Sequence, residues 1–516
     1  MIITELQQLY AAHPNVEGMY RLLQDNSVRH LYCSGLCASA ASLFSSVLIQ
    51  RVECPFVFIL GDLEEAGYFY HDLTQILGTE QVLFFPSSFR RAIKYGQKDA
   101  ANEILRTEVL SRLQKGEEGL CVVTYPDALA EKVVSRKELG DKTLKLHLGE
   151  KVDMDFVTEV LRSYSFEYVD YVYEPGQYAV RGSIIDVFSF SSEFPFRIDF
   201  FGDEVESIRT FEVESQLSKE KKENIVIVPD LSHSLEQRGN GGMVSFLDFL
   251  QPDTLLAMKD FLWLRERIQT VHDEALTAQA IAAREAEENG LISLDGKLID
   301  GGEFTLRALD FRRIEFGTKP TGTPDATVTF NTTAQPIFHK NFDLVAESFH
   351  DYLSRNYALY ICSDSLKQTE RIRAIFEDRG DNISFTSVER TLHEGFADDA
   401  LRLCIFTDHQ LFDRFHKYNL KSDKARSGKV ALSLKELNQF TPGDYVVHTD
   451  HGVGRFTGLV RIPNGDTTQE VMRLVYQNDD VVFVSIHSLH KVSKYKGKEG
   501  EAPRLNKLGT GAWEKL

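Results

Sequence analysis

The first 127 residues alternate short apolar runs with longer amphipathic segments. The runs 55–60 (PFVFIL) and 119–124 (GLCVVT) are typical of buried strands, and the segment 63–77 between them is typical of a helix. Strands that alternate with helices of this length predict a parallel sheet covered on both faces. The same pattern predicts further strands at 30–33 and 81–85, and further helices at 36–49 and 99–114.

From about residue 128 to 212 the apolar runs follow one another more closely. One helical segment, 153–163, is followed by β runs that Gly and Pro residues separate. This spacing predicts a compact α+β domain. The expected strands are 178–181, 184–190, 196–201 and 205–211.

The segment 213–333 is less regular, with one expected strand at 224–228 and a long helix at 261–288. A loop-like stretch, 317–324 (GTKPTGTP), marks a candidate domain boundary. Alternation then resumes and predicts a second, small α/β domain over 334–416. Its expected helices are 342–353 and 366–378, and its strands 358–362 and 402–406.

The polar, basic segment 417–438 has the composition of a linker. After it, residues 439–505 contain only short β runs, which predicts a small SH3/Tudor-like β-barrel. The expected strands are 444–448, 454–461, 470–476 and 481–485.

The composition agrees with this multidomain α/β architecture, because 516 residues correspond to about three or four domains. A net charge of −19 argues against a chain that coats nucleic acid without sequence preference. No apolar run approaches the roughly 18 residues of a membrane span, and no secretory signal opens the chain. Six cysteines without a CxxC pair, of which only Cys33 and Cys37 lie close together, predict free thiols in a reducing, cytoplasmic protein.

Two further motifs could indicate a binding site, but each has a purely structural explanation. The turn Ser34–Ser39 (SGLCAS) lies where a P-loop would lie, but Ala38 occupies the position of its lysine and no acidic metal-binding pair follows a later strand. We therefore expect neither ATP binding nor catalytic or cofactor-binding residues in this chain. The histidines and the aspartate near the C-terminal end are better explained by hairpin turns than by a metal site: His448, Asp450, His451, His487 and His490.

Two stretches carry a specific resemblance. The sequence EPGQYAVRGSIIDVF…FRIDFFGDEVESIRTFE (174–212) resembles a signature shared by the excision-repair protein UvrB and the transcription-repair coupling factor Mfd. The C-terminal run GDYVVHTDHGVGRFTGL…LVYQNDDVVFVSIHSLHKVSKY…PRLNKLGTGAWEKL resembles the RNA-polymerase-interacting domain of Mfd, which is related to CarD. Because UvrB lacks that unit, the combination resembles the Mfd family.

The resemblance implies a UvrB-like degenerate P-loop-type domain made of 1–127 and 213–333, with 128–212 inserted as a UvrA-binding domain. The small α/β domain and a CarD-like domain at 439–505 follow, and 506–516 would begin a helix that leads to a translocase motor absent from this chain. The family's DNA-probing hairpin, long in UvrB, has only 86–98 as its counterpart here, so we do not expect damage probing.

The family's function is transcription-coupled nucleotide excision repair, in which a polymerase stalled at a lesion is bound, UvrA is recruited and ATP drives polymerase release. ATP, Mg²⁺ and double-stranded DNA would be ligands of the absent motor. An alternative is a stand-alone ATP-dependent helicase-like enzyme or a UvrB-like damage-binding protein.

The family's contact positions can be transferred to this sequence. For UvrA they fall on Arg181, Arg197 and Phe201, where two guanidiniums would pair with carboxylates of the partner around an aromatic anchor. The alternative is that both arginines pair inside the domain with Asp186 or Asp199.

For the β subunit of RNA polymerase, the resemblance indicates Leu459, Arg461 and Ile462 on an exposed strand edge. We expect Pro463 to end the pairing of that strand, because it lacks an N–H.

Overall fold

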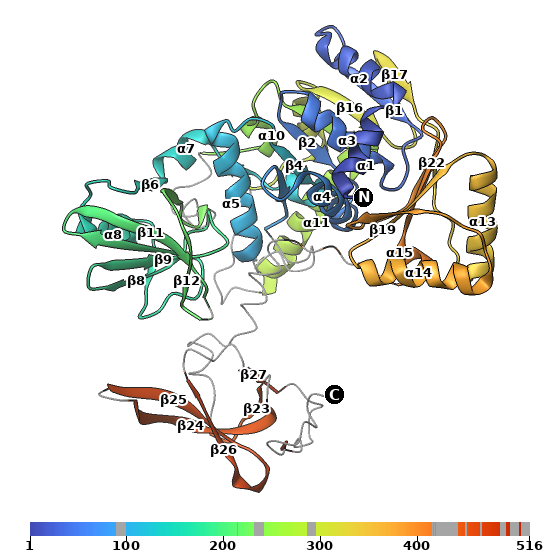
Figure 1. The fold of residues 1–516 in the computed structure, drawn as a ribbon. Coiled ribbons are helices and arrows are strands. Elements are labelled where there is room, and N and C mark those ends of the chain that lie inside the picture. The colour runs from blue at the N-terminus through green and yellow to red at the C-terminus, as the bar shows by residue number, and fades with distance from the viewer. Residues whose placement is uncertain are drawn as a thin grey trace. The chain divides into compact units, whose positions relative to one another are not determined.

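The structure is a computed structural model of the chain. It describes residues 1–88, 100–213, 215–231, 242–285, 296–414, 416, 418, 420, 442–448, 451–464, 467–485, 492–495 and 505–506. By its contacts the chain divides into residues 1–141 with 231–420 and residues 142–230 with 421–516. The domains are described below one at a time (Figure 1).

The first domain is built on a seven-stranded parallel sheet with the order β17-β1-β16-β15-β2-β4-β3. Four strands come from the first part of the chain and three from a part beyond residue 250. Strand β1 therefore lies between two strands that are far from it in sequence. One sheet is thus assembled from two separate segments of the chain. The bounds are β1 His30–Ser34, β2 Phe56–Ile59, β3 Val82–Phe85, β4 Cys121–Thr124, β15 Leu255–Lys259, β16 Arg312–Phe316 and β17 Ala326–Thr329.

The domain has helices close to the expected 63–77, 99–114 and 261–288, and further helices, α1, α2, α6, α7, α10 and α12, that were not predicted from the sequence. The helix expected from residue 36 begins only at Ala40, because Gly35 and Ala38 have φ of +77° and +48°, outside the helical region. The bounds are α1 Ile3–Ala11, α2 Pro14–Gln24, α3 Ala40–Arg51, α4 Leu63–Leu77, α5 Ala100–Lys115, α6 Pro126–Ala130, α7 Arg136–Asp141, α10 Phe246–Phe249, α11 Phe261–Glu285 and α12 Gly301–Ala308, with a small ribbon of β5 Val133–Val134 and β14 Met243–Val244.

The small α/β domain contains a five-stranded sheet with the order β18-β21-β22-β19-β20. Its core is rich in Phe side chains from the helices and the central strands, such as Phe349, Phe376 and Phe406. The bounds are β18 Thr332–Ala334, α13 Phe342–Ser354, β19 Ala358–Ser363, α14 Leu366–Arg379, β20 Thr386–Glu389, β21 Phe396–Asp398, β22 Leu403–Thr407 and α15 Asp408–Leu411.

Buried polar contacts join the small α/β domain to the first domain. The Tyr10 hydroxyl donates to Asp398 Oδ2 at 2.7 Å, and both side chains are fully buried. The N–H of His393 donates to the buried Asp72 carboxylate at 2.7 Å, and the Tyr68 and His393 rings stack at 3.5 Å. The two domains therefore share one interior.

The inserted domain has a six-stranded sheet with the order β12-β11-β10-β9-β8-β7, and a separate pair of β13 with β6. The predicted boundary at 212 differs from the structure, because β12 pairs with β11 and β13 pairs with β6, so the compact unit continues to Asp230. The bounds are β6 Leu144–His147, α8 Met154–Ser163, β7 Glu167–Tyr168, β8 Gln177–Arg181, β9 Ile184–Val187, β10 Phe196–Phe201, β11 Glu204–Phe211, β12 Ser218–Lys221 and β13 Asn224–Ile227.

The C-terminal domain is an antiparallel five-stranded sheet with the order β26-β25-β24-β23-β27. Its pairings follow one another without joining the two end strands among the residues that the structure describes. The predicted closed barrel is therefore not confirmed and stays a prediction. The bounds are β23 Tyr445–His448, β24 Gly452–Asn464, β25 Thr467–Val475, β26 Val481–Ser485 and β27 Val492–Lys494, with a 3₁₀ turn at Gln477–Asp479.

The cysteines agree with one further expectation. All six cysteines are free thiols, four of them buried, and burial raises the pKa of Cys33 to about 12. No helix in the described part of the chain combines the length and the apolar character that a bilayer crossing requires. The linker 417–438 and the segment 506–516 lie almost wholly outside the described residues.

Candidate partner-binding sites

The central sheet of the inserted domain has one apolar and one polar face. Along β10, Phe196, Ile198 and Phe200 are buried in the core, which also takes in Val157 and Leu161 of α8. The alternate residues, Arg197, Asp199 and Phe201, lie on the opposite face by the two-residue period of a strand. This polar face carries all three residues expected to contact UvrA.

A buried carboxylate organises the arginines of this face. Asp186 of β9 lies directly opposite Arg197 in the antiparallel ladder, and its side chain is only 1% exposed. Arg197 donates to both of its oxygens, Nε to Oδ1 at 2.7 Å and Nη2 to Oδ2 at 2.9 Å. Arg181 Nη2 also donates to Oδ2. The pairing inside the domain, expected as the alternative, is thus present for both arginines.

The third expected residue is available to a partner. Phe201 is 78% exposed, although the other phenylalanines of β10 are buried. Sequence reasoning did not find the groups that hold the arginines from the sides: Arg197 lies 4.5 Å from the Phe211 ring centroid and Arg181 lies 5.1 Å from that of Tyr171. Only the strand register, which places Arg197 beside Asp186, could have indicated this cluster from the sequence.

In the C-terminal domain, strands β24 and β25 continue beyond their neighbours as a two-stranded ribbon. The ladder between them runs from Arg455 to Asn464, whereas β23 pairs only with residues 452–455 and β26 only with residues 471–475. From Leu459 onward, β24 thus has one edge without a partner strand among the described residues. The expected contact residues Leu459, Arg461 and Ile462 all lie on this ribbon, and Leu459 is 38% exposed.

The prediction that Pro463 ends the pairing is wrong. The ladder continues through Pro463 opposite Thr468 and Asn464 opposite Thr467. Proline is tolerated in an antiparallel strand where its nitrogen points away from the partner strand. Successive backbone N–H groups point to opposite edges of a strand. The N–H groups of Leu459 and Arg461 therefore point to the same edge as the nitrogen of Pro463.

The turn that follows β1 is occupied by other parts of the chain. Cys37 N–H donates to Thr332 Oγ1 at 3.0 Å, and Ser39 N–H donates to the Glu394 carbonyl at 3.3 Å. A Cβ on Gly35 would lie 2.0 Å from the Phe330 carbonyl oxygen, so glycine is required here for packing. Backbone N–H groups that would hold phosphates in a P-loop are therefore already engaged.

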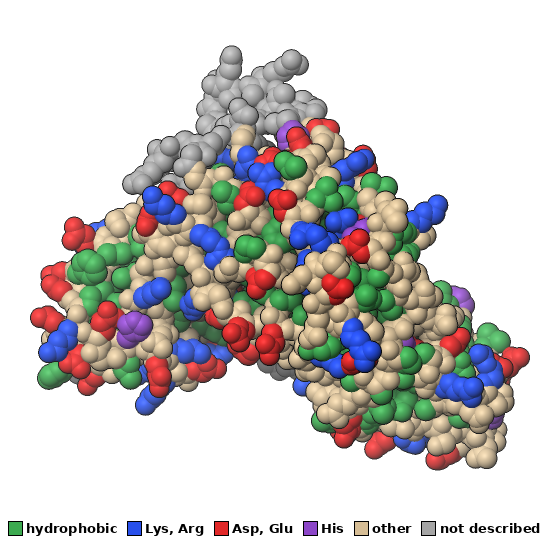
Figure 2. Space-filling view, turned by 90° about the horizontal axis from the view of Figure 1, so that it is seen from above, with side chains coloured by type: hydrophobic (Ala, Val, Ile, Leu, Met, Phe, Trp, Pro, Cys, Tyr) green, Lys and Arg blue, Asp and Glu red, His purple; other side chains and the backbone are tan. Residues whose placement is uncertain are grey.

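A cleft of about 470 Å³ lies beside this turn, and the charged residues of its lining are mainly acidic. Asp62, Glu64, Glu65 and Glu394 line it, and Lys259 is paired with Glu65. Carboxylates repel the phosphates of a nucleotide. On the face of the molecule shown in Figure 2, acidic and basic side chains are otherwise interspersed.

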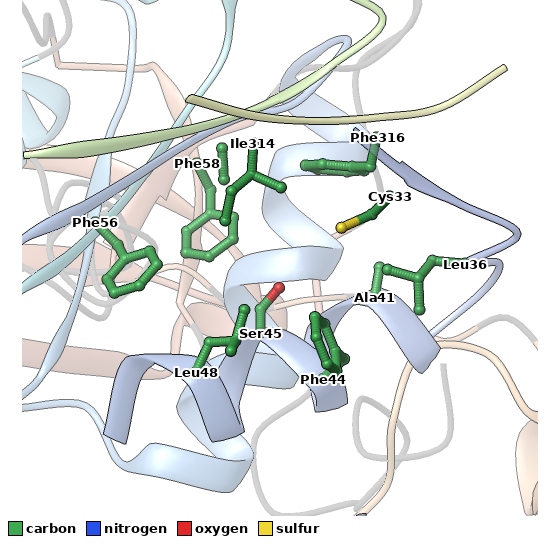
Figure 3. Close-up of a pocket in the computed structure, with 11 residues that line it drawn as sticks. Cys33, Leu36, Ala41, Phe44, Ser45, Leu48, Phe56, Phe58, Ile314 and Phe316 are labelled. Carbon is green, nitrogen blue, oxygen red and sulfur yellow. The ribbon is translucent and has the colours of Figure 1, made fainter. Parts of the chain in front are cut away.

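Between α3 and the sheet there is a second, small cavity of about 20 Å³ (Figure 3). Phe44 and Leu48 point into it from the helix, and Phe56, Phe58 and Ile314 from the strands. This volume holds about one water molecule and the lining is apolar, so the cavity is a packing defect and not a binding site.

Four histidines cluster where α4 meets the small α/β domain: His71, His393, His409 and His416. His409 and His416 stack at 4.4 Å, and His71 and His416 lie 4.9 Å apart. Burial lowers the pKa of His71 and His409 to about 4 and that of His393 to about 3. No group of three or more metal-ligating side chains has metal-binding geometry among the described residues.

Of the C-terminal residues considered above for a metal site, His448 and His451 stack at 4.6 Å, and Asp450, His487 and His490 lie outside the described residues.

Comparisons with known proteins agree with these domains. The model of the UvrB interaction domain matches residues 144–233, and the model of the CarD-like/TRCF RID domain matches residues 440–496. A transcription-repair-coupling factor of Staphylococcus aureus (strain bovine RF122 / ET3-1) is 24% identical over 93% of this chain, and one of Bacillus subtilis (strain 168) is 23% identical over 94%. The chain resembles transcription-repair-coupling factors.

This confirms the resemblance expected from the sequence. The chain spans about half the length of these coupling factors, 46% in both cases. The matched range 144–233 contains the strands β12 and β13, in agreement with an inserted domain that continues past residue 212.

Proposed function

We propose that this chain couples RNA polymerase to nucleotide excision repair by binding the polymerase with its C-terminal domain and UvrA with its inserted domain. The observation that carries the proposal is the presence of both a UvrB interaction domain and a CarD-like/TRCF RID domain in one chain. The likeness to coupling factors over nearly the whole chain supports the same order of domains. ATP, Mg²⁺, DNA and polymerase release belong, in this proposal, to further parts of a coupling factor.

The UvrA site in this proposal is the polar face of the inserted domain around Arg181, Arg197 and Phe201. An aromatic side chain as exposed as Phe201 is the kind of residue that anchors a protein interface. An arginine beside it supplies charge that can recognise a carboxylate.

The polymerase site in this proposal is the free edge of the β24–β25 ribbon, which would accept a strand of the β subunit. The backbone groups of Leu459 and Arg461 supply the hydrogen bonds of the added strand. A closed SH3/Tudor-like barrel, inferred from the short β runs of 439–505, and a cytoplasmic location, inferred from the free cysteines, remain parts of the proposal.

Two substitutions on different domains test this function. Phe201→Ala should weaken binding to purified UvrA by at least about tenfold and leave polymerase binding unchanged, because it removes an exposed anchor from one domain only. Ile462→Arg should weaken polymerase binding and leave UvrA binding unchanged. The introduced guanidinium would lose its hydration at the polymerase interface without gaining a partner.

The strand edge can be tested more closely with a matched pair. Arg461→Pro removes an N–H from the free edge without removing a bond to β25, whereas Arg461→Ala keeps the N–H. Only the proline variant should lose polymerase binding in a pull-down with the isolated β subunit. Equal binding by both variants would contradict strand addition at this edge.

A further inference from the structure

The two arginines of the UvrA face are not equivalent, although sequence reasoning gives them the same task. Arg197 uses three nitrogens inside the domain: Nε and Nη2 bind Asp186, and Nη1 donates to the Gln216 carbonyl at 3.1 Å. One side of its guanidinium faces the Phe211 ring, and its side chain is only 15% exposed. The pair with Asp186 raises the pKa of Arg197, so this guanidinium is a fixed cation.

Arg181 keeps more of its binding capacity. Only one of its nitrogens, Nη2, contacts Asp186, and its side chain is 38% exposed. On strand β8, Ala179 lies directly opposite Asp186. Because the side chain of Ala179 is small, Arg181, two residues further along β8, has room to reach the Asp186 carboxylate. A guanidinium has five N–H donors, so most of those of Arg181 remain for a partner.

The charges of Asp186, Arg181 and Arg197 also distinguish the two arginines. One buried carboxylate faces two guanidiniums, so the cluster has a net charge of about +1, with the excess on the exposed Arg181 side. A partner that brought two carboxylates would leave one of them without a cation.

We propose that Arg197 is a positioning residue that occupies Asp186, and that Arg181 binds a single carboxylate of the partner beside an apolar socket for Phe201. This inference rests on the proposed UvrA-binding function and specifies the chemistry of the partner surface. While Arg197 satisfies the carboxylate of Asp186 with two nitrogens, Arg181 can exchange its single contact for one with the partner. Without Arg197, the buried carboxylate binds Arg181 instead and withdraws it from the interface.

The test is a rescue experiment with purified UvrA and the whole chain. Arg197→Gln alone should weaken UvrA binding by about tenfold, because Asp186 then captures Arg181. The double variant Arg197→Gln with Asp186→Asn removes both members of the buried pair and should bind within about threefold of the unmodified chain. Arg181→Gln should weaken binding about tenfold and reduce its dependence on salt concentration, because the interfacial charge pair is gone.

Each result decides between the alternatives. If the double variant binds as weakly as Arg197→Gln, then Arg197 contacts the partner itself and the inference is overturned. If Phe201→Ala and Arg181→Gln both leave UvrA binding unchanged, the proposed site itself is wrong. Thermal unfolding of each variant shows whether the domain is folded, and the double variant avoids leaving a buried charge without a partner.

Discussion

Single residues on the polar face of the inserted domain show how far a sequence can specify a site. The alternation along 196–201 separates the buried Phe200 from the exposed Phe201, and strand periodicity is enough to predict this. Which carboxylate holds Arg197 depends on the register between β9 and β10, which is set by a long connection and not by local sequence. The sequence therefore offered Asp186 and Asp199 as partners of the arginines inside the domain, but it did not show which of the two carboxylates holds them.

At the same scale, the histidine cluster predicts that the chain becomes less stable in mild acid. The pKa of His71 is lowered from 6.5 to about 4 by burial, so the unfolded chain binds more protons between these values. Stability should accordingly fall as the pH decreases from 6.5 to 4, by up to about 1.4 kcal/mol per pH unit for each such histidine.

The variant His71→Phe checks this prediction, since it keeps a ring at the site and removes the titrating group. Urea unfolding at several pH values should give a shallower loss of stability below pH 6.5 than in the unmodified chain. An identical slope for His71→Phe would show that this histidine is not held neutral.

At the scale of helices and strands, the sequence predicts well those elements whose ends are set by neighbouring residues. Helix α4 was predicted with the bounds that the structure has, because an N-cap at Asp62 and a C-cap at Gly78 mark its ends. The late start of α3 was missed, because the two left-handed residues before it are explained by contacts with Phe330, Thr332 and Glu394, far along the chain. Strand β24 continues through Pro463 because the proline nitrogen points away from the partner strand β25.

The turn between β1 and α3 leads to a prediction about ATP. Restoring the P-loop lysine by Ala38→Lys should not create ATP binding, because the N–H groups of Cys37 and Ser39 already have acceptors and the adjoining cleft is acidic. Isothermal titration of ATP with Mg²⁺ into this variant, and into Ala38→Gln as a control, should give no heat of binding at micromolar concentrations. A micromolar dissociation constant for the unmodified chain would contradict the reading of this turn as degenerate.

For the molecule as a whole, the sequence indicates the order of domains but not which of them share an interior. The first domain and the small α/β domain were expected as separate units, yet Asp398, the last residue of β21, is buried against α1. Its pKa is lowered against the effect of burial, by His13, whose Nε2 lies 3.4 Å from the carboxylate, and by hydrogen bonds from Tyr10 and the Leu401 N–H. A buried charge that is satisfied from both domains couples their stabilities.

This coupling can be measured with Tyr10→Phe. Loss of a hydrogen bond to a buried carboxylate should cost about 1.5–3 kcal/mol, and hydrogen exchange should become faster in both α1 and β21. The control is Tyr357→Phe, whose hydroxyl donates to Asp399 at 2.6 Å inside the small domain. That change should affect the small domain alone. Faster exchange in β21 only, for Tyr10→Phe, would argue against coupling.

The position of β1 in the first sheet has a consequence for synthesis on the ribosome. Both neighbours of β1 are encoded roughly 280 or more residues later than β1 itself. At about 5–20 residues per second, the apolar strand waits for tens of seconds before either neighbour emerges. The inserted domain, whose paired strands lie within residues 144–227, can fold during that interval. The nascent chain would then carry a finished inserted domain before the domain around it exists, and it would be most dependent on chaperones while β1 is still unpaired.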